Sequence, residues 1–195
     1  MATKVVWSHA PLIVGLLALV PAVLTIAAAS VPGFSISSAL IADALWAFLA
    51  LGWVGAILAS RQRRNVGGGR RVPWSRANAP AVLLLTAVVV ASGLPLNVRF
   101  GLSRSAFEQL PERGLSYDVG ASAGLYEVCC FERTDFGYQF GVSEGPNVVW
   151  GFAFSPDGVP PGPDVDSGGL TNLQEGDNAY RHLDGPWYIW EFLFT

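Results

Sequence analysis

Three long apolar segments occupy the first half of the chain and constrain its fold more than any other feature. They read APLIVGLLALVPAVLTIAAA at 10–29, SALIADALWAFLALGWVGAILA at about 38–59, and NAPAVLLLTAVVVASGLPL at about 78–96. A helix needs about 20 residues to cross the hydrocarbon core of a bilayer. The segments therefore predict three transmembrane helices.

Two other interpretations of these segments compete. The first segment could be a cleaved signal peptide, because Lys4 precedes it and Ala27 and Ala29 resemble a cleavage site. Its apolar run is, however, longer than the roughly 7–15 residues of a signal core. If the segments were instead buried helices of a soluble protein, they would require a larger core than 195 residues can enclose.

The distribution of charge divides the chain into two parts. From residue 97 onward, the chain has fourteen Asp and Glu residues and five Arg residues, which gives that half a net charge of −9. The preceding half is apolar, apart from a basic stretch between its second and third segments. We therefore predict a transmembrane domain at 1–96 and an α+β domain at 97–195.

The basic stretch at 60–77 begins RQRRNVGGGRR after Ser60. Six of the chain's twelve basic residues lie in it: Arg61, Arg63, Arg64, Arg70, Arg71 and Arg76. Its glycines lack the Gly-Lys-Ser/Thr ending of a phosphate loop, and the only aromatic residue nearby is Trp74. Short loops rich in Lys and Arg stay in the cytoplasm. The stretch therefore predicts a topology signal rather than a nucleic-acid site.

The cytoplasmic loop determines the predicted orientation of the whole chain. The N-terminus would lie inside and the C-terminal domain outside, in a multi-pass protein of the cell membrane. Small residues recur four apart in the second segment, as at Gly52 and Ala56, and would allow another helix to approach closely. The expected partners are the lipid bilayer and another membrane or envelope protein, or a second copy of the chain.

The C-terminal half has the pattern of strands. Runs rich in Val, Phe, Tyr and Trp are separated by Gly, Pro, Asp and Asn, which favours a small antiparallel sheet. Ser105 and Glu108 have capping-box spacing and predict a short helix at about 104–112. Residues 156–179 read as a long loop. In the last run, Tyr188, Trp190, Phe192 and Phe194 would share one face, which favours a role in the core.

The order of these features resembles a group of proteins. Three helices, an arginine loop, LNVRFGLSRSAFE, GFAFSPDG and YRHLDGPWYIWEF are similar to uncharacterised small membrane proteins of high-GC Gram-positive bacteria. The resemblance implies the same topology with an exported, aromatic-rich C-terminal domain, and it assigns no activity.

Cys129 and Cys130 are the only cysteines and are adjacent. Neighbouring Cα atoms are about 3.8 Å apart, below the usual separation in a disulfide, and strand neighbours point to opposite faces. We therefore expect one thiol packed in the core and one exposed, where it could link two chains. A vicinal redox pair is the alternative.

The segment DVDSGGLTNLQE at 164–175 partly matches a calcium-binding loop. Asp164, Asp166 and Glu175 fill the first, third and twelfth ligand positions, and Gly169 falls at the turn. Gly168 replaces an oxygen ligand, and the flanks are not helical in pattern. The interpretations are a solvated acidic loop or a low-affinity calcium site, and calcium is the only cofactor that we consider.

The sequence contains few residues that could carry out catalysis. Ser155, His182 and Asp184 could form a hydrolytic set, but no G-x-S-x-G sequence accompanies them. We therefore expect an integral membrane protein whose extracytoplasmic domain binds a partner or ligand without catalysis. The alternatives are an envelope enzyme that uses His182 with nearby carboxylates, and a structural or regulatory subunit of a membrane complex.

Overall fold

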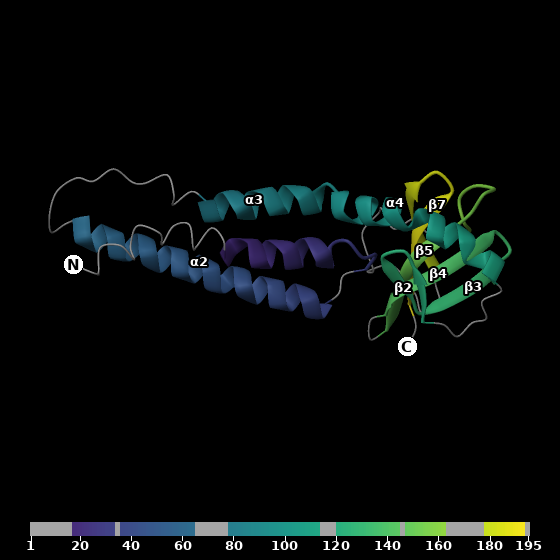
Figure 1. Cartoon of the computed structure of the whole chain (residues 1–195), viewed down its shortest axis with the longest axis horizontal. Helices are drawn as coiled ribbons and strands as arrows, with labels where there is room; N and C mark the ends of the chain where they lie inside the picture. The colour runs from purple at the N-terminus through teal and green to yellow at the C-terminus, as the bar shows by residue number, and fades with distance from the viewer. Residues whose placement is uncertain are drawn as a thin grey trace. The chain divides into compact units, whose positions relative to one another are not determined.

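A computed structural model describes residues 17–33, 36–64, 78–113, 120–144, 147–162 and 178–193. The chain forms two compact units. The first contains Met1–Ala28 and Ile36–Ser92, and the second contains Ala29–Ser35 and Gly93–Thr195. The prediction of helices followed by an antiparallel sheet domain is confirmed (Figure 1).

The first unit contains a helix at Leu17–Ala28, α2 (Ile36–Arg64) and α3 (Asn78–Ala91). Among its described residues, two threonine hydroxyls form hydrogen bonds within the unit. The Thr25 hydroxyl donates to the Pro21 carbonyl oxygen at 2.7 Å and accepts the indole N–H of Trp46 at 3.1 Å. The Thr86 hydroxyl donates to the Val82 carbonyl oxygen at 2.8 Å. Such bonds allow hydroxyls to lie in apolar helices.

No single helix among the described residues combines the length and the apolar composition that a membrane crossing needs. The apolar helical stretches Leu17–Ala28 and Leu40–Gly55 are shorter. Helices α3 and α4 (Leu94–Gln109) meet the requirement as a pair, with a bend of 53° between them.

The break between α3 and α4 corrects the predicted third segment. Instead of one helix over 78–96, α3 ends at Ala91 because Gly93 takes a left-handed conformation with φ 66°. Glycine adopts this conformation readily and commonly ends helices. Pro95 then lies in the first turn of α4, where its missing N–H costs nothing.

Helix α4 also corrects the short helix predicted at 104–112. It is already helical ten residues earlier, so Ser105 lies inside the helix and does not cap it. A one-turn 3-10 helix, Pro111–Arg113, follows. The capping-box pattern was misleading because the helix begins at Leu94, and Glu108 instead accepts a hydrogen bond from Arg104, one turn earlier in the same helix.

The second unit contains two antiparallel sheets. Strands β1 (Ala121–Ala123) and β2 (Tyr126–Val128) form a hairpin. The other sheet has the order β3-β4-β5-β7-β6 and is antiparallel throughout. Its strands are β3 (Cys130–Thr134), β4 (Gly137–Glu144), β5 (Val148–Phe154), β6 (Asn178–Asp184) and β7 (Trp187–Leu193).

Two predicted strand boundaries differ from the structure. The run at 123–133 forms two strands in different sheets, β2 and β3, which meet at Cys129. Strand β6 begins within the predicted 156–179 loop, because Asn178 and Ala179 pair with β7 across the sheet. The pairing supplies backbone hydrogen bonds that local composition does not reveal.

Helix α4 covers one face of the larger sheet and forms the main core with it (Figure 1). Phe100 contacts Phe152 at 4.7 Å between ring centroids, and Phe107 contacts Phe140 at 5.3 Å. The buried members of this core are Leu96, Phe100, Phe107, Leu110, Ala123, Tyr126, Val128, Phe140, Phe152, Trp187 and Ile189.

The last strand contributes to both faces of the sheet. Trp187 and Ile189 belong to the α4 side, whereas Tyr188 and Trp190 lie in a second cluster, against which Phe192 packs. The prediction that these alternate aromatic residues share one face within a core is confirmed. Phe194 lies outside the described residues.

Candidate functional site

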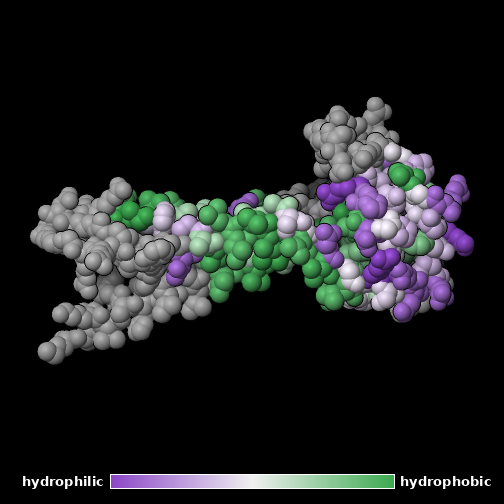
Figure 2. All heavy atoms as spheres, turned by 90° about the horizontal axis from the view of Figure 1, so that it is seen from above, coloured by the Kyte–Doolittle hydropathy of each residue, from purple (hydrophilic) through white to green (hydrophobic). Residues whose placement is uncertain are grey.

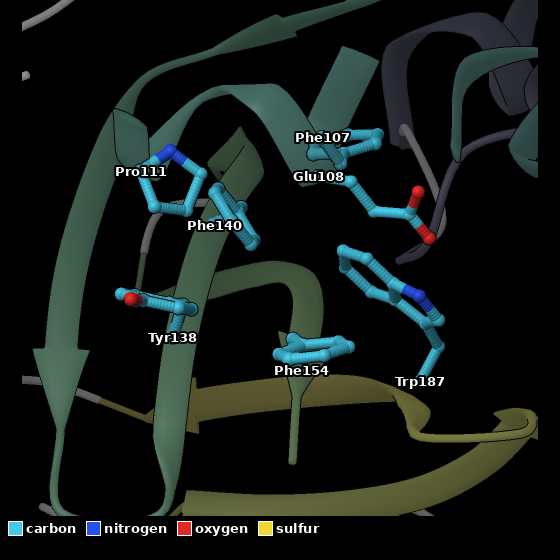
Figure 3. Close-up of a pocket in the computed structure, with 7 residues that line it drawn as sticks. All are labelled: Phe107, Glu108, Pro111, Tyr138, Phe140, Phe154 and Trp187. Atoms are coloured by element: carbon cyan, nitrogen blue, oxygen red, sulfur yellow. The ribbon is translucent and has the colours of Figure 1, made fainter. Parts of the chain in front are cut away.

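A pocket of about 110 Å³ lies between α4 and the larger sheet of the second unit (Figure 3). Helix α4 contributes Phe107 and Glu108, and Pro111 follows it in the 3-10 helix. The sheet contributes four aromatic side chains. They are Tyr138, Phe140, Phe154 and Trp187.

Strand register explains why three of these aromatic residues meet. Tyr138 of β4 pairs with Phe154 of β5, which in turn pairs with Trp187 of β7. Paired residues in adjacent strands point to the same face. The ring centroids are 6.4 Å apart for Tyr138 and Phe154, and 5.1 Å apart for Phe154 and Trp187. The three rings thus form a row across the floor of the pocket.

The indole of Trp187 is an unpaired donor in the pocket wall. Its Nε1 is buried and has no hydrogen-bond partner among the described residues. In Figure 3 this nitrogen lies on the side of the ring nearer the Glu108 carboxylate. An unsatisfied buried donor of this kind costs roughly 1–3 kcal/mol of stability.

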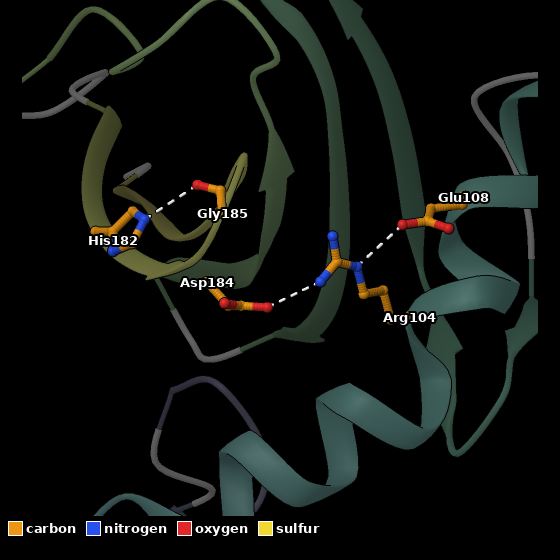
Figure 4. Close-up of polar contacts among 5 residues, drawn as sticks. All are labelled: Arg104, Glu108, His182, Asp184 and Gly185. Carbon is orange, nitrogen blue, oxygen red and sulfur yellow. Dashed lines mark hydrogen bonds and ion pairs between the residues drawn. The ribbon is translucent and has the colours of Figure 1, made fainter.

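Charged groups connect α4 to the β6–β7 turn beside the pocket (Figure 4). Arg104 Nε lies 3.0 Å from Glu108 Oε1, and its Nη1 lies 2.8 Å from Asp184 Oδ2. Two carboxylates against one guanidinium give the group a net charge of −1. Because all three side chains are more than a third exposed, each ion pair contributes only about 0–1 kcal/mol to stability.

The proposed hydrolytic residues do not form a catalytic set. His182 is exposed, and its Nε2 lies 3.0 Å from the Gly185 carbonyl oxygen, within the β6–β7 turn (Figure 4). The Ser155 hydroxyl donates to the Gly158 carbonyl oxygen at 2.6 Å. Asp184 binds Arg104. Each of the three side chains therefore has a different partner, and the geometry gives this hydrolytic set no support.

The cysteine pair differs from the sequence expectation. Cys129 and Cys130 are not joined by a disulfide, and both are half-buried, rather than one buried and one exposed. Their Sγ atoms lie 3.5 Å apart, on the same side of the chain. The assumption of regular strand alternation was wrong because the chain passes from β2 to β3 at this point.

The predicted calcium ligands Asp164, Asp166 and Glu175 lie outside the described residues. Among the described residues, no three His, Cys, Asp or Glu side chains gather to hold a metal ion. Of the loop arginines, Arg61, Arg63 and Arg64 belong to the last turn of α2, so the predicted loop at 60–77 begins within a helix. Arg70, Arg71 and Arg76 are not described.

One polar cluster was missed by sequence reasoning. Arg99 of α4 donates to the Ser30 hydroxyl at 3.0 Å and to the Leu125 carbonyl oxygen, and its guanidinium lies 4.5 Å from the ring centroid of Tyr126. The cluster attaches the residues after the first helix to the second unit. No local motif marks it, because its members are distant in sequence.

No family model, curated protein or solved structure matches the chain. The resemblance to uncharacterised small membrane proteins of high-GC Gram-positive bacteria therefore stays a prediction.

Proposed function

We propose that the chain is a multi-pass membrane protein whose second unit lies outside the cytoplasm and binds a partner through the aromatic pocket. The observation that carries the membrane part of this proposal is the exposure of large apolar side chains on the helices of the first unit. Phe48 is 73% exposed, Leu51 is 70% exposed and Leu84 is 66% exposed. In Figure 2 these helices present a mostly apolar surface.

Lipid is the environment that such a surface fits. Soluble monomers rarely expose contiguous apolar patches larger than a few hundred Å². Among the described residues, every large apolar side chain that is exposed lies on a helix except Leu125 and Val159. The hydroxyls of Thr25 and Thr86 are bonded to helix carbonyls, as they must be in a medium without water.

The orientation is inferred from the arginines. Arg61, Arg63 and Arg64 end α2, and three more arginines follow before α3. Each basic residue near an anionic cytoplasmic leaflet contributes about 1 kcal/mol. The 60–77 stretch therefore lies inside, and the acidic second unit lies outside.

The size and charge of the pocket indicate the kind of partner. Pockets for complete small molecules have volumes of roughly 300–1,000 Å³, so a pocket of about 110 Å³ fits a single side chain or a group of that size. Aromatic walls favour an apolar or aromatic group. The net charge of −1 on Arg104, Glu108 and Asp184 favours a positive charge beside that group.

Two small probes of the same shape test the pocket directly. Phenethylamine and 3-phenylpropionate share an aromatic ring and differ in the sign of their charge. With the full chain in detergent and its tryptophans labelled with ¹⁵N, we expect phenethylamine to shift the Trp187 indole N–H signal saturably. The anion should bind at least about twofold more weakly, because partly exposed charges contribute about 0.2–1 kcal/mol.

A matched pair of acidic residues provides the control. Glu108→Gln should weaken the binding of phenethylamine. Glu112→Gln should leave that binding unchanged, since Glu112 is exposed and does not line the pocket. If neither probe moves the Trp187 signal, or if both bind equally well, the binding part of the proposal is wrong.

A further inference from the structure

Cys129 and Cys130 lie opposite the same residue of the neighbouring strand. The Cys129 N–H donates to the Gly141 carbonyl oxygen at 2.9 Å, and Cys130 is the register partner of Gly141 in the β3–β4 ladder. Two residues opposite one constitute a β-bulge, which redirects side chains. The bulge explains why the two thiols lie on one side, with their Sγ atoms 3.5 Å apart.

Gly141 provides the space that both sulfur atoms occupy. A Cβ at this position would lie 2.2 Å from Cys130 Sγ and 2.9 Å from Cys129 Sγ. Any larger residue would therefore displace at least one thiol. Both cysteines remain partly accessible to solvent, so the pair is a dithiol that an external reagent can reach.

The geometry of the pair disfavours a stable disulfide. Adjacent Cα atoms are about 3.8 Å apart, whereas disulfides usually join Cα atoms separated by 4.4–6.8 Å. A bridging ion, by contrast, requires little movement of the sulfurs. With zinc–sulfur bonds of about 2.3 Å, the sine of half the sulfur–metal–sulfur angle equals half of the 3.5 Å separation divided by the bond length. The angle is therefore about 100°.

We propose that Cys129 and Cys130 form a two-thiolate site for a thiophilic ion that prefers tetrahedral coordination, of the class of Zn²⁺ and Cd²⁺. An angle of about 100° is close to the tetrahedral value and far from the linear arrangement of two-coordinate ions. The pair supplies two ligands and water fills the others, as in an open site. Because thiols must lose their protons to bind, affinity rises with pH.

Cadmium is the probe for this site. Cd²⁺ is added to the reduced full chain in detergent, and the ultraviolet charge-transfer absorption of cadmium–thiolate bonds is followed. We expect one Cd²⁺ per chain. Cys129→Ser and Cys130→Ser should each weaken binding about a hundredfold or more, since the gain from joining two ligands is lost.

Gly141→Ala separates the geometry of the pair from the mere presence of two thiols. The new Cβ meets sulfur atoms at the ends of side chains that can rotate, so the fold can adapt while the two thiols move apart. We expect this variant to keep both thiols and to bind Cd²⁺ at least about tenfold more weakly. The proposal is overturned if Gly141→Ala binds like the parent, or if either single serine variant does.

Discussion

The Tyr126 hydroxyl donates a hydrogen bond of 2.9 Å to the carbonyl oxygen of Ser30, 96 positions earlier in the chain. It attaches the residues after the first helix to the β1–β2 hairpin. Gly33, three residues later, packs against β5, because a Cβ there would lie 2.0 Å from the Trp150 ring. The second unit is therefore built from two separate parts of the sequence.

Burial raises the pKa of Tyr126 well above its usual range, and the Arg99 charge lowers it in part, so the hydroxyl stays a neutral donor.

Tyr126→Phe should destabilise the protein by about 1–3 kcal/mol, because it leaves the buried Ser30 carbonyl without its donor. The measurement is the free energy of unfolding of the full chain in detergent. Tyr138→Phe is the control, since its ring is only partly buried. Equal losses in the two variants would contradict this role for the Tyr126–Ser30 bond.

Glu191→Gln should stabilise the protein at neutral pH. Burial raises the pKa of Glu191, against the opposing effects of the Arg181 charge and a hydrogen bond from Trp150. Because the folded-state pKa lies above the ordinary value of 4.5, the contribution of Glu191 to stability is complete below pH 4.5 and is lost as pH rises through the raised pKa. Parent and variant should therefore melt at similar temperatures at pH 4, with the variant melting higher at pH 7. A parent that melts higher at pH 7 would refute the direction of this effect.

Gly124→Ala should be more damaging than Gly120→Ala, although both glycines flank β1. Gly124 has φ 63°, and a Cβ there would lie 2.8 Å from the Cα of Ser103 in α4. A non-glycine residue in this conformation costs about 1–2 kcal/mol before the contact with the helix is counted. Gly120 has only one neighbour within reach, at 3.7 Å. Thermal melts of the two variants compare these costs, and similar melting temperatures would argue against close packing of the hairpin on α4.

The proposed topology predicts opposite labelling at two introduced cysteines. In a chain lacking Cys129 and Cys130, a cysteine at the exposed Asp157 should react in intact cells with a membrane-impermeant thiol reagent. A cysteine at Gly68, within the arginine-rich stretch, should react only after the membrane is opened. Labelling at position 68 but not at position 157 in intact cells would show that the orientation is the opposite of the proposed one.

Most strands of the sheet unit could be predicted because local patterns determine them. Apolar runs bounded by Gly, Pro and Asn predicted strands β4, β5 and β7, and alternation placed Tyr188, Trp190 and Phe192 on one face. The predicted helix break was placed too late, since Gly93 lies inside an unbroken apolar run. A single left-handed glycine ends a helix without changing the hydrophobic pattern around it.

The candidate sites could not be predicted in the same way, because they depend on pairing between distant segments. Register across β4, β5 and β7 brings Tyr138, Phe154 and Trp187 into one row, and a shift of one residue would turn a strand's side chains to the other face. The bulge opposite Gly141 likewise places two adjacent thiols on one side. The sequence by itself therefore determined the apolar helices, the basic stretch between them and the strand-forming half. Only the tertiary structure decided which side chains meet, because register, bulges and the attachment of Ser30 to Tyr126 are set by long-range contacts that no local pattern encodes.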